Sequence, residues 1–153
     1  MKNTSPFILT LALVWIGFAS TQVYAQTPTP NSEVQASEKI HHVVMQLVSD
    51  DLMSWKGLMK NLSNLTSGWP ELEIMIVCHG PGIYFVHNEK SPHIEAIRRY
   101  AAQGVIFAAC ENTMKGKNIS NELITEVAER VPMGIQTLVL KQEEGWAYVK
   151  AGL

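Results

Sequence analysis

Cys110 is the residue of this chain best placed to do chemistry. It directly follows a short apolar run, Val105 to Ala109, which predicts a buried strand ending at the thiol. In open parallel α/β sheets, ligands and reactions gather just outside the carboxyl ends of the strands. We therefore expect a nucleophilic sulfur that is open to solvent at the rim of a sheet.

The residues after Cys110 bear on its charge state. A thiolate needs electropositive surroundings, such as helix N-terminal amides or a nearby cation, to stay ionised near neutral pH. The turn 111–114 offers backbone N–H groups, and Lys115 and Lys117 follow it, whereas Glu111 acts in the opposite sense. The alternative interpretation is a small buried hydrophobic residue, which is how most free cysteines behave.

Cys78 is the second cysteine, and it also closes an apolar run. Neighbouring parallel strands lie only about 4.8 Å apart, so Cys78 could form a disulfide or a redox pair with Cys110 if their strands are adjacent. The residues that follow Cys78 make a tight turn. This turn either forms a wall of the site, with His79 beside the thiol, or has a structural role alone. These residues are His79, Gly80, Pro81 and Gly82.

Other reaction classes have less support in the sequence. A metal site built from the cysteines with His79, His87 and His93 would lack the Cys-x-x-Cys or His-x-x-x-His spacing of such sites. The chain also has no Gly-x-Ser-x-Gly nucleophile elbow and no glycine pattern of a phosphate-binding loop. We predict neither a metal nor a cofactor.

The elements that would position these residues alternate between strands and helices. We expect strands over 40–48, 72–78, 105–109 and 135–140, and helices over 52–65, from 91 to 103, after Ser120 as far as Pro132, and in the tail 142–153. This alternation implies right-handed crossovers and a mainly parallel sheet. The predicted fold is a single three-layer α/β/α domain, doubly wound, with four to five strands.

The N-terminal part of the chain predicts export. Lys2, the apolar run from Phe7 to Phe18 and the small residue Ala25 are typical of a signal peptide over residues 1–25 that is cleaved on export. Residues 26–37 are polar and rich in Pro, Thr and Ser, which predicts a flexible leader before a domain over 38–153. We expect a periplasmic protein that has no membrane anchor after cleavage.

The charge of the chain excludes one class of partner. It carries 12 Lys and Arg against 14 Asp and Glu, a formal net charge of −2, without a basic run. Nucleic acids and anionic membrane surfaces are bound by basic patches, so neither is expected as a partner.

Three segments together resemble the DsrE/DsrF-like family, and the likeness extends over essentially the whole predicted domain. The first two are the turn 79–82 and the segment 104–114, which ends in Cys110, Glu111, Asn112, Thr113 and Met114. The third is the tail, where Pro132, Met133, Gly134 and Ile135 lead into residues 138–148.

The resemblance implies a doubly wound parallel α/β domain that forms homo-oligomers, often trimers or hexamers. It also implies that Cys110 accepts sulfane sulfur as a persulfide from a donor protein and passes it to an acceptor. The implied binding residues are His79, Gly80, Gly82, Asn112, Thr113 and Met114, with the amides of the last three stabilising the thiolate. Two features depart from the family pattern: the export signal, since sulfur-relay members work in the cytoplasm, and Cys78.

Two other functions remain open on the sequence. One is a non-catalytic, oligomeric ligand-binding or assembly module in which both cysteines are inert. The other is a thiol–disulfide redox element that uses Cys78 and Cys110.

Overall fold

Five parallel strands form one sheet, in the order β4-β3-β2-β1-β5. The computed structural model describes residues 40–152; the predicted signal peptide and leader lie outside the described residues. The strands are β1 (His41–Leu47), β2 (Leu72–Cys78), β3 (Ile106–Cys110), β4 (Ala128–Val131) and β5 (Ala147–Lys150). The sheet confirms the predicted α/β class with a parallel sheet and a single domain.

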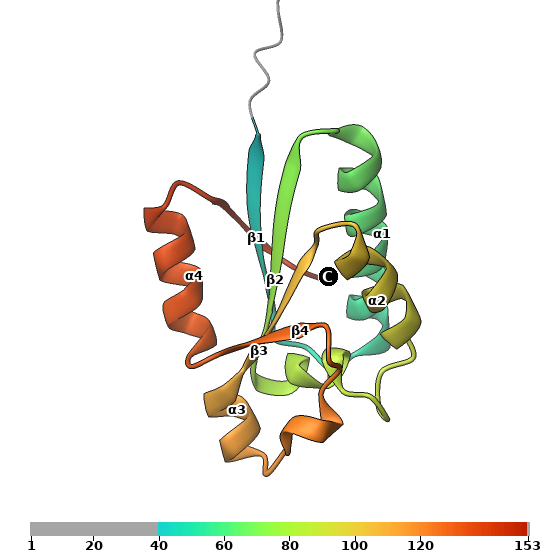
Figure 1. Cartoon of the computed structure of the whole chain (residues 1–153), viewed down its shortest axis with the longest axis vertical. Helices are drawn as coiled ribbons and strands as arrows, with labels where there is room; N and C mark the ends of the chain where they lie inside the picture. The colour runs from blue at the N-terminus through green and yellow to red at the C-terminus, as the bar shows by residue number, and fades with distance from the viewer. Residues whose placement is uncertain (1–39, 153) are drawn as a thin grey trace, which may run out of the picture. The chain divides into compact units, whose positions relative to one another are not determined.

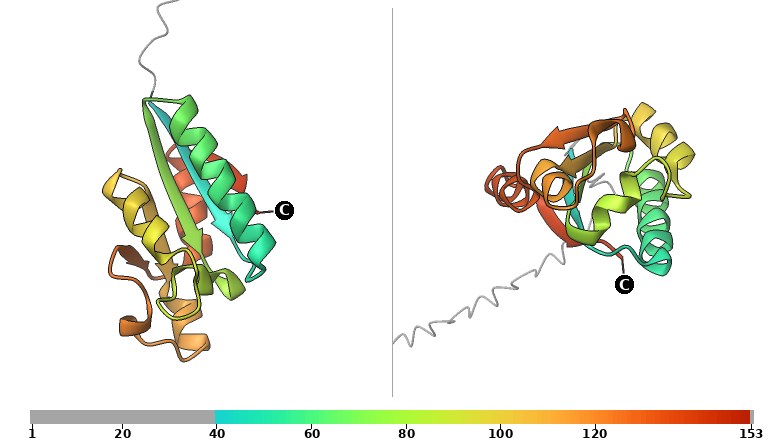
Figure 2. Two further views of the ribbon diagram at one scale, coloured as in Figure 1. Left: turned by 90° about the vertical axis from the view of Figure 1, so that its right-hand side faces the viewer. Right: turned by 90° about the horizontal axis from the view of Figure 1, so that it is seen from below.

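Helices cover both faces of the sheet. They are α1 (Leu52–Gly68), α2 (Ile94–Ala102), α3 (Glu111–Gly116) and α4 (Gly134–Glu143), with two 3-10 segments, η1 (Gly80–Val86) and η2 (Asn121–Leu123). In Figure 1, α1 and α2 lie on one side of the strands and α4 lies on the other, while α3 lies at the end where β3 finishes. The views of Figure 2 show the same three layers from the side and from below.

The sheet has a larger and a smaller core. On the α1 and α2 face, Trp55, Leu58 and Ile97 join side chains of every second strand residue. On the other face, Leu138 of α4 packs on a small cluster that includes Val44 and Val77. Because neighbouring residues of a strand point to opposite faces, the odd and even positions of β1 and β2 serve different cores.

Helix α1 follows from its sequence. Asp51 caps it, since its carboxylate accepts a hydrogen bond from the Ser54 N–H at 2.9 Å. Trp55, Leu58 and Leu62 recur at helical spacing and are buried against the sheet. The prediction of a helix here, between two buried strands, is confirmed.

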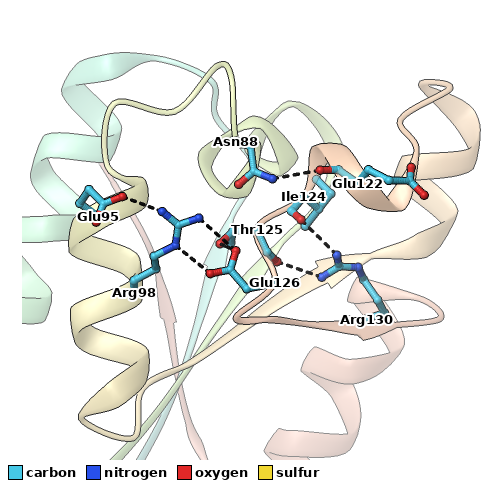
Figure 3. A network of polar contacts seen from close by, with 8 residues as sticks. All are labelled: Asn88, Glu95, Arg98, Glu122, Ile124, Thr125, Glu126 and Arg130. Atoms are coloured by element: carbon cyan, nitrogen blue, oxygen red, sulfur yellow. Dashed lines mark hydrogen bonds and ion pairs between the residues drawn. The ribbon is translucent and has the colours of Figure 1, made fainter.

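The predicted helix after Ser120 is wrong. The chain forms only the short η2 and then enters β4. The carbonyls of Asn121, Ile124 and Thr125 accept hydrogen bonds from the Arg130 guanidinium, so they are not taken up by an α-helical ladder. Figure 3 shows part of this network, in which Arg98 of α2 also holds Glu126 through two hydrogen bonds and Asn88 reaches the Glu122 carbonyl.

The predicted strand over 135–140 and the predicted helix in the tail are both wrong. Residues 134–143 form α4, and residues 147–150 form β5 at the edge of the sheet beside β1. The apolar run misled the prediction because only Leu138 and Gly134 of α4 are buried, whereas Ile135, Val139 and Leu140 are exposed. Gly145, with a φ of +89°, follows the end of α4 and lets the chain turn into β5.

Candidate functional site

Cys110 is the last residue of β3 and directly precedes α3. Its Sγ accepts a hydrogen bond from the N–H of Gly134, the first residue of α4, at 3.2 Å. Two helices therefore begin at this sulfur, α3 from the same strand and α4 from across the sheet edge. The first N–H groups of a helix have no partner within their own helix, and the Gly134 N–H uses this freedom to donate to Sγ.

Asn112 and Thr113 also act on the sulfur. The Gly134 N–H makes the hydrogen bond to Sγ, and the Thr113 hydroxyl and the backbone N–H groups of Asn112 and Thr113 act with it to lower the pKa of the thiol. The Thr113 Oγ1 accepts a hydrogen bond from the Gly80 N–H at 3.0 Å, which leaves its own hydrogen available for the sulfur. The Asn112 N–H also donates to the Pro132 carbonyl at 3.2 Å.

These contacts set the charge state of Cys110. Burial raises the pKa of the thiol, but the hydrogen bonds from Thr113, Gly134 and Asn112 outweigh it and leave the pKa below its ordinary value. The groups that lower this pKa are Thr113, Gly134 and Asn112, and the two lysines that follow Thr113 are not among these groups. Lys117 instead extends over the ring of Tyr84, 5.3 Å from its centroid.

The sulfur is less open than the sequence led us to expect. Cys110 exposes only 4% of its surface, because α4 begins directly over it. The thiol is therefore at the predicted edge of the sheet, but it is buried there, and the expectation of a sulfur open to solvent is wrong.

Cys78 has opposite surroundings. It pairs in register with Ala109, so Cys110, one residue further on, points to the other face of the sheet. Cys78 is fully buried in the larger core, and this burial strongly raises the pKa of its thiol. Both cysteines are free, and no disulfide joins them in the structure. This placement gives no support to Cys78 as a redox partner of Cys110.

His79 follows β2 and lies beside Cys110 across Gly134. A Cβ placed on Gly134 would lie 3.1 Å from the His79 Cβ and 3.4 Å from the Cys110 Cβ. The His79 Nε2 is 2.9 Å from the Gln46 Nε2, and burial lowers the pKa of the imidazole. His79 is thus a neighbour of the thiol with a polar contact of its own.

The other predicted binding residues make contacts that support the fold around the site. Gly82 packs against β1 so closely that an added Cβ would lie 2.2 Å from the Leu47 carbonyl oxygen. Met114 is buried in the larger core. Gly80 adopts a φ of +53°, which favours glycine, and its N–H reaches Thr113.

Three residues of this region were not found from the sequence. Gly134 binds the sulfur from 24 positions away, and Gln46 and Tyr148 lie in one row with His79. Gly134 follows the end of β4, so correct placement of that strand would have brought it to the same edge of the sheet. No sequence signal pairs Gln46 with Tyr148.

The histidines do not gather with the cysteines. His87 accepts a hydrogen bond from the Glu89 N–H at 3.2 Å, and His93 packs against Trp55 and Phe85. Within residues 40–152, no group of three or more His, Cys, Asp or Glu side chains is arranged to hold a metal ion. None of the helices in that range is both long enough and apolar enough to cross a bilayer.

A solved structure shares this architecture. The structure of MTH1491, a protein of unknown function from Methanobacterium thermoautotrophicum, is 27% identical, with a TM-score of 0.70 over 72% of this chain and 98% of its own. The structure of BT1422, a conserved protein of unknown function from Bacteroides thetaiotaomicron, is 15% identical, with a TM-score of 0.46 over 71% of this chain and 92% of its own. No curated protein matches the chain.

The family comparison agrees with the motifs around Cys110. The DsrE/DsrF-like family matches residues 38–151, which include every residue described at the site. This match includes all five strands of the sheet, the thiol at the end of β3 and the turn after β2. The chain belongs to the DsrE/DsrF-like family.

Proposed function

We propose that this protein is a sulfur carrier that accepts sulfane sulfur on Cys110 as a persulfide and passes it to an acceptor thiol. The observation that carries the proposal is the hydrogen bond from the Gly134 N–H to Sγ at the start of α4, which together with the neighbouring Thr113 and Asn112 groups lowers the pKa of the thiol. The thiolate is the nucleophilic form of cysteine. Family membership adds independent support, because the family is associated with sulfur relay.

The reaction needs no cofactor. The Cys110 thiolate attacks the sulfane sulfur of a persulfide or polysulfide, a new S–S bond forms, and the donor leaves as a thiolate with the electron pair of the old bond. In the second step an acceptor thiolate attacks the terminal sulfur, and Cys110 leaves as a thiolate. The same donors that stabilise Cys110 at rest make it a good leaving group.

The burial of Cys110 bears on the choice of sulfur donor. With 4% of the residue exposed, a small polysulfide reaches the sulfur more easily than a cysteine on a folded protein. A protein donor would need the start of α4 to move away from the sulfur. We therefore regard a low-molecular-weight polysulfide as the better first donor to test.

The proposal includes an export step and an assembly. The expected signal peptide would bring the protein to the periplasm, which fractionation of cells that express the full chain would test. The exposed apolar residues of α4 support a homo-oligomer in which α4 is covered: Met133, Ile135, Val139 and Leu140. Light scattering coupled to size exclusion should give the mass of a trimer or a hexamer; a monomer would remove this part of the proposal.

Mass spectrometry of polysulfide-treated protein tests the function. We expect one added sulfur on the peptide that contains Cys110, and no adduct in Cys110→Ser. Cys78→Ala is the matched control and should load as the parent protein does, because Cys78 lies on the other face of the sheet. Absence of an adduct on Cys110 in the parent protein would contradict the proposal.

One observation favours a second candidate, a non-catalytic assembly module. Cys110 is almost as buried as a core residue, and α4 exposes an apolar surface that a partner could cover. In that case Cys110 should resist alkylation in the folded protein while the oligomer remains stable. Rapid alkylation of Cys110 would reject this candidate.

A further inference from the structure

A row of polar side chains crosses the sheet toward Cys110, on the face covered by α4. Tyr148 of β5 pairs in register with Val44, which belongs to the smaller core on that face. Gln46, two residues after Val44, shares its face. The Tyr148 hydroxyl donates to the Gln46 Oε1, and the Gln46 Nε2 is 2.9 Å from the His79 Nε2.

The orientation of the Gln46 amide in this row assigns the tautomer of His79. The amide nitrogen of Gln46 can only donate, so the His79 Nε2 must accept its hydrogen and cannot carry a proton of its own. Burial lowers the pKa of the imidazole, which keeps the ring neutral at pH 7. The single ring proton is then on Nδ1, and no hydrogen bond joins Nδ1 to another residue within 40–152.

Gly134 lies between His79 and Cys110 and is in close contact with both residues. A side chain there would begin 3.1 Å from the His79 Cβ and 3.4 Å from the Cys110 Cβ. Sγ itself already accepts a hydrogen bond from the Gly134 N–H. A second sulfur atom attached to Sγ extends beyond that hydrogen bond, and it needs a donor of its own.

We propose that His79 binds the terminal sulfur of the Cys110 persulfide through its Nδ1–H, and that Gln46 and Tyr148 are positioning residues that hold His79 in the required tautomer. This inference rests on the proposed sulfur-carrier function. The ligand it specifies is anionic sulfane sulfur, which accepts a charge-assisted hydrogen bond from a neutral, preorganised donor.

The chemical step balances without proton transfer to His79. The Cys110 thiolate and a donor persulfide RS–SH give the Cys110 perthiolate, the thiolate RS⁻ and one proton released to water. The S–S bond of the donor breaks as the new S–S bond forms, so no oxidant or reductant is consumed. His79 contributes only the hydrogen bond that stabilises the perthiolate.

Three substitutions of His79 separate its two ring nitrogens. The amide N–H of Asn lies where Nδ1–H lies in histidine, whereas the amide of Gln reaches the place of Nε2. After loading with polysulfide and removal of the excess, mass spectrometry should show the Cys110 persulfide decaying about tenfold faster in His79→Ala than in the parent protein. His79→Asn should restore the parent lifetime, and His79→Gln should not.

Two further measurements distinguish a His79 that binds the persulfide from a His79 that only supports the local structure. Alkylation of resting, unloaded Cys110 should be unchanged in all three variants, because its own donors remain. In ¹⁵N spectra of the full protein, His79 should be protonated on Nδ1. In Gln46→Glu a carboxylate faces Nε2, so the proton should move to Nε2 and the persulfide should decay as in His79→Ala. Tyr148→Phe should give a smaller loss.

The outcomes separate the two proposals. If the parent protein takes up no sulfur, the carrier function fails, and the role of His79 fails with it. If the parent protein loads but His79→Ala keeps the same persulfide lifetime, only the role of His79 is overturned. A resting His79 protonated on Nε2 would also overturn it.

Discussion

The two cysteines lie at the ends of adjacent strands, yet the two faces of the sheet give them opposite chemistry. Cys78 points into the larger core, where burial raises the pKa of its thiol. Cys110 points toward the start of α4, where hydrogen bonds lower it. Burial alone therefore does not decide whether a cysteine is inert; what decides is whether N–H and O–H donors enter the buried space with it.

The largest contrast we expect between the two cysteines is in stability. Cys78→Ser places a hydroxyl in an apolar core and should lower the free energy of unfolding by about 1–3 kcal/mol. Cys110→Ser keeps an acceptor for the Gly134 N–H and should cost under about 1 kcal/mol. Urea denaturation of both variants measures this, with Cys78→Ala as a control for lost volume. Equal losses would contradict the description of two different environments.

Removal of the Thr113 hydroxyl should bring the pKa of Cys110 closer to the raised pKa of Cys78. Thr113→Val takes away the hydroxyl that lowers the pKa of Cys110, so this pKa should rise and alkylation of Cys110 at pH 7 should slow about tenfold. Thr113→Ser restores a hydroxyl and should recover most of the rate. Thr66→Val is the matched control, since Thr66 bonds only to α1 carbonyls. An unchanged rate in Thr113→Val would show that the hydroxyl has no influence on the thiol.

A smaller effect is expected when a methyl group is added at Gly134, beside Cys110. In Gly134→Ala the new Cβ would lie 3.1–3.4 Å from His79, Val77 and Cys110, so these residues must shift by a few tenths of an ångström. We expect a loss of about 1 kcal/mol in stability and slower alkylation of Cys110, by less than in Thr113→Val. Gly116→Ala, which meets open space in α3, should change neither. The same behaviour in both variants would remove Gly134 from the site.

The sequence was informative where the relevant contacts are local. Leu72–Cys78 reads as one buried strand because its side chains are apolar on both faces, and Cys110 and Thr113 are only three positions apart. Gly134 and the Tyr148–Gln46 pair meet across 24 and 102 positions, so only the sheet order brings them together. The run 135–140 failed as a strand because α4 buries little more than Leu138 beneath it, a tertiary choice that composition does not record.

The central claim is that Cys110 is a stabilised thiolate while Cys78, one strand away, is an inert thiol. The most direct measurement is the pH dependence of iodoacetamide labelling of both cysteines in the same folded sample, resolved by peptide mass spectrometry. We predict that Cys110 reacts with a midpoint below about 8.5, the value of an ordinary cysteine, and that Cys78 is unlabelled across the range. A Cys110 midpoint at or above that value, or labelling of Cys78 at a similar rate, would contradict the account.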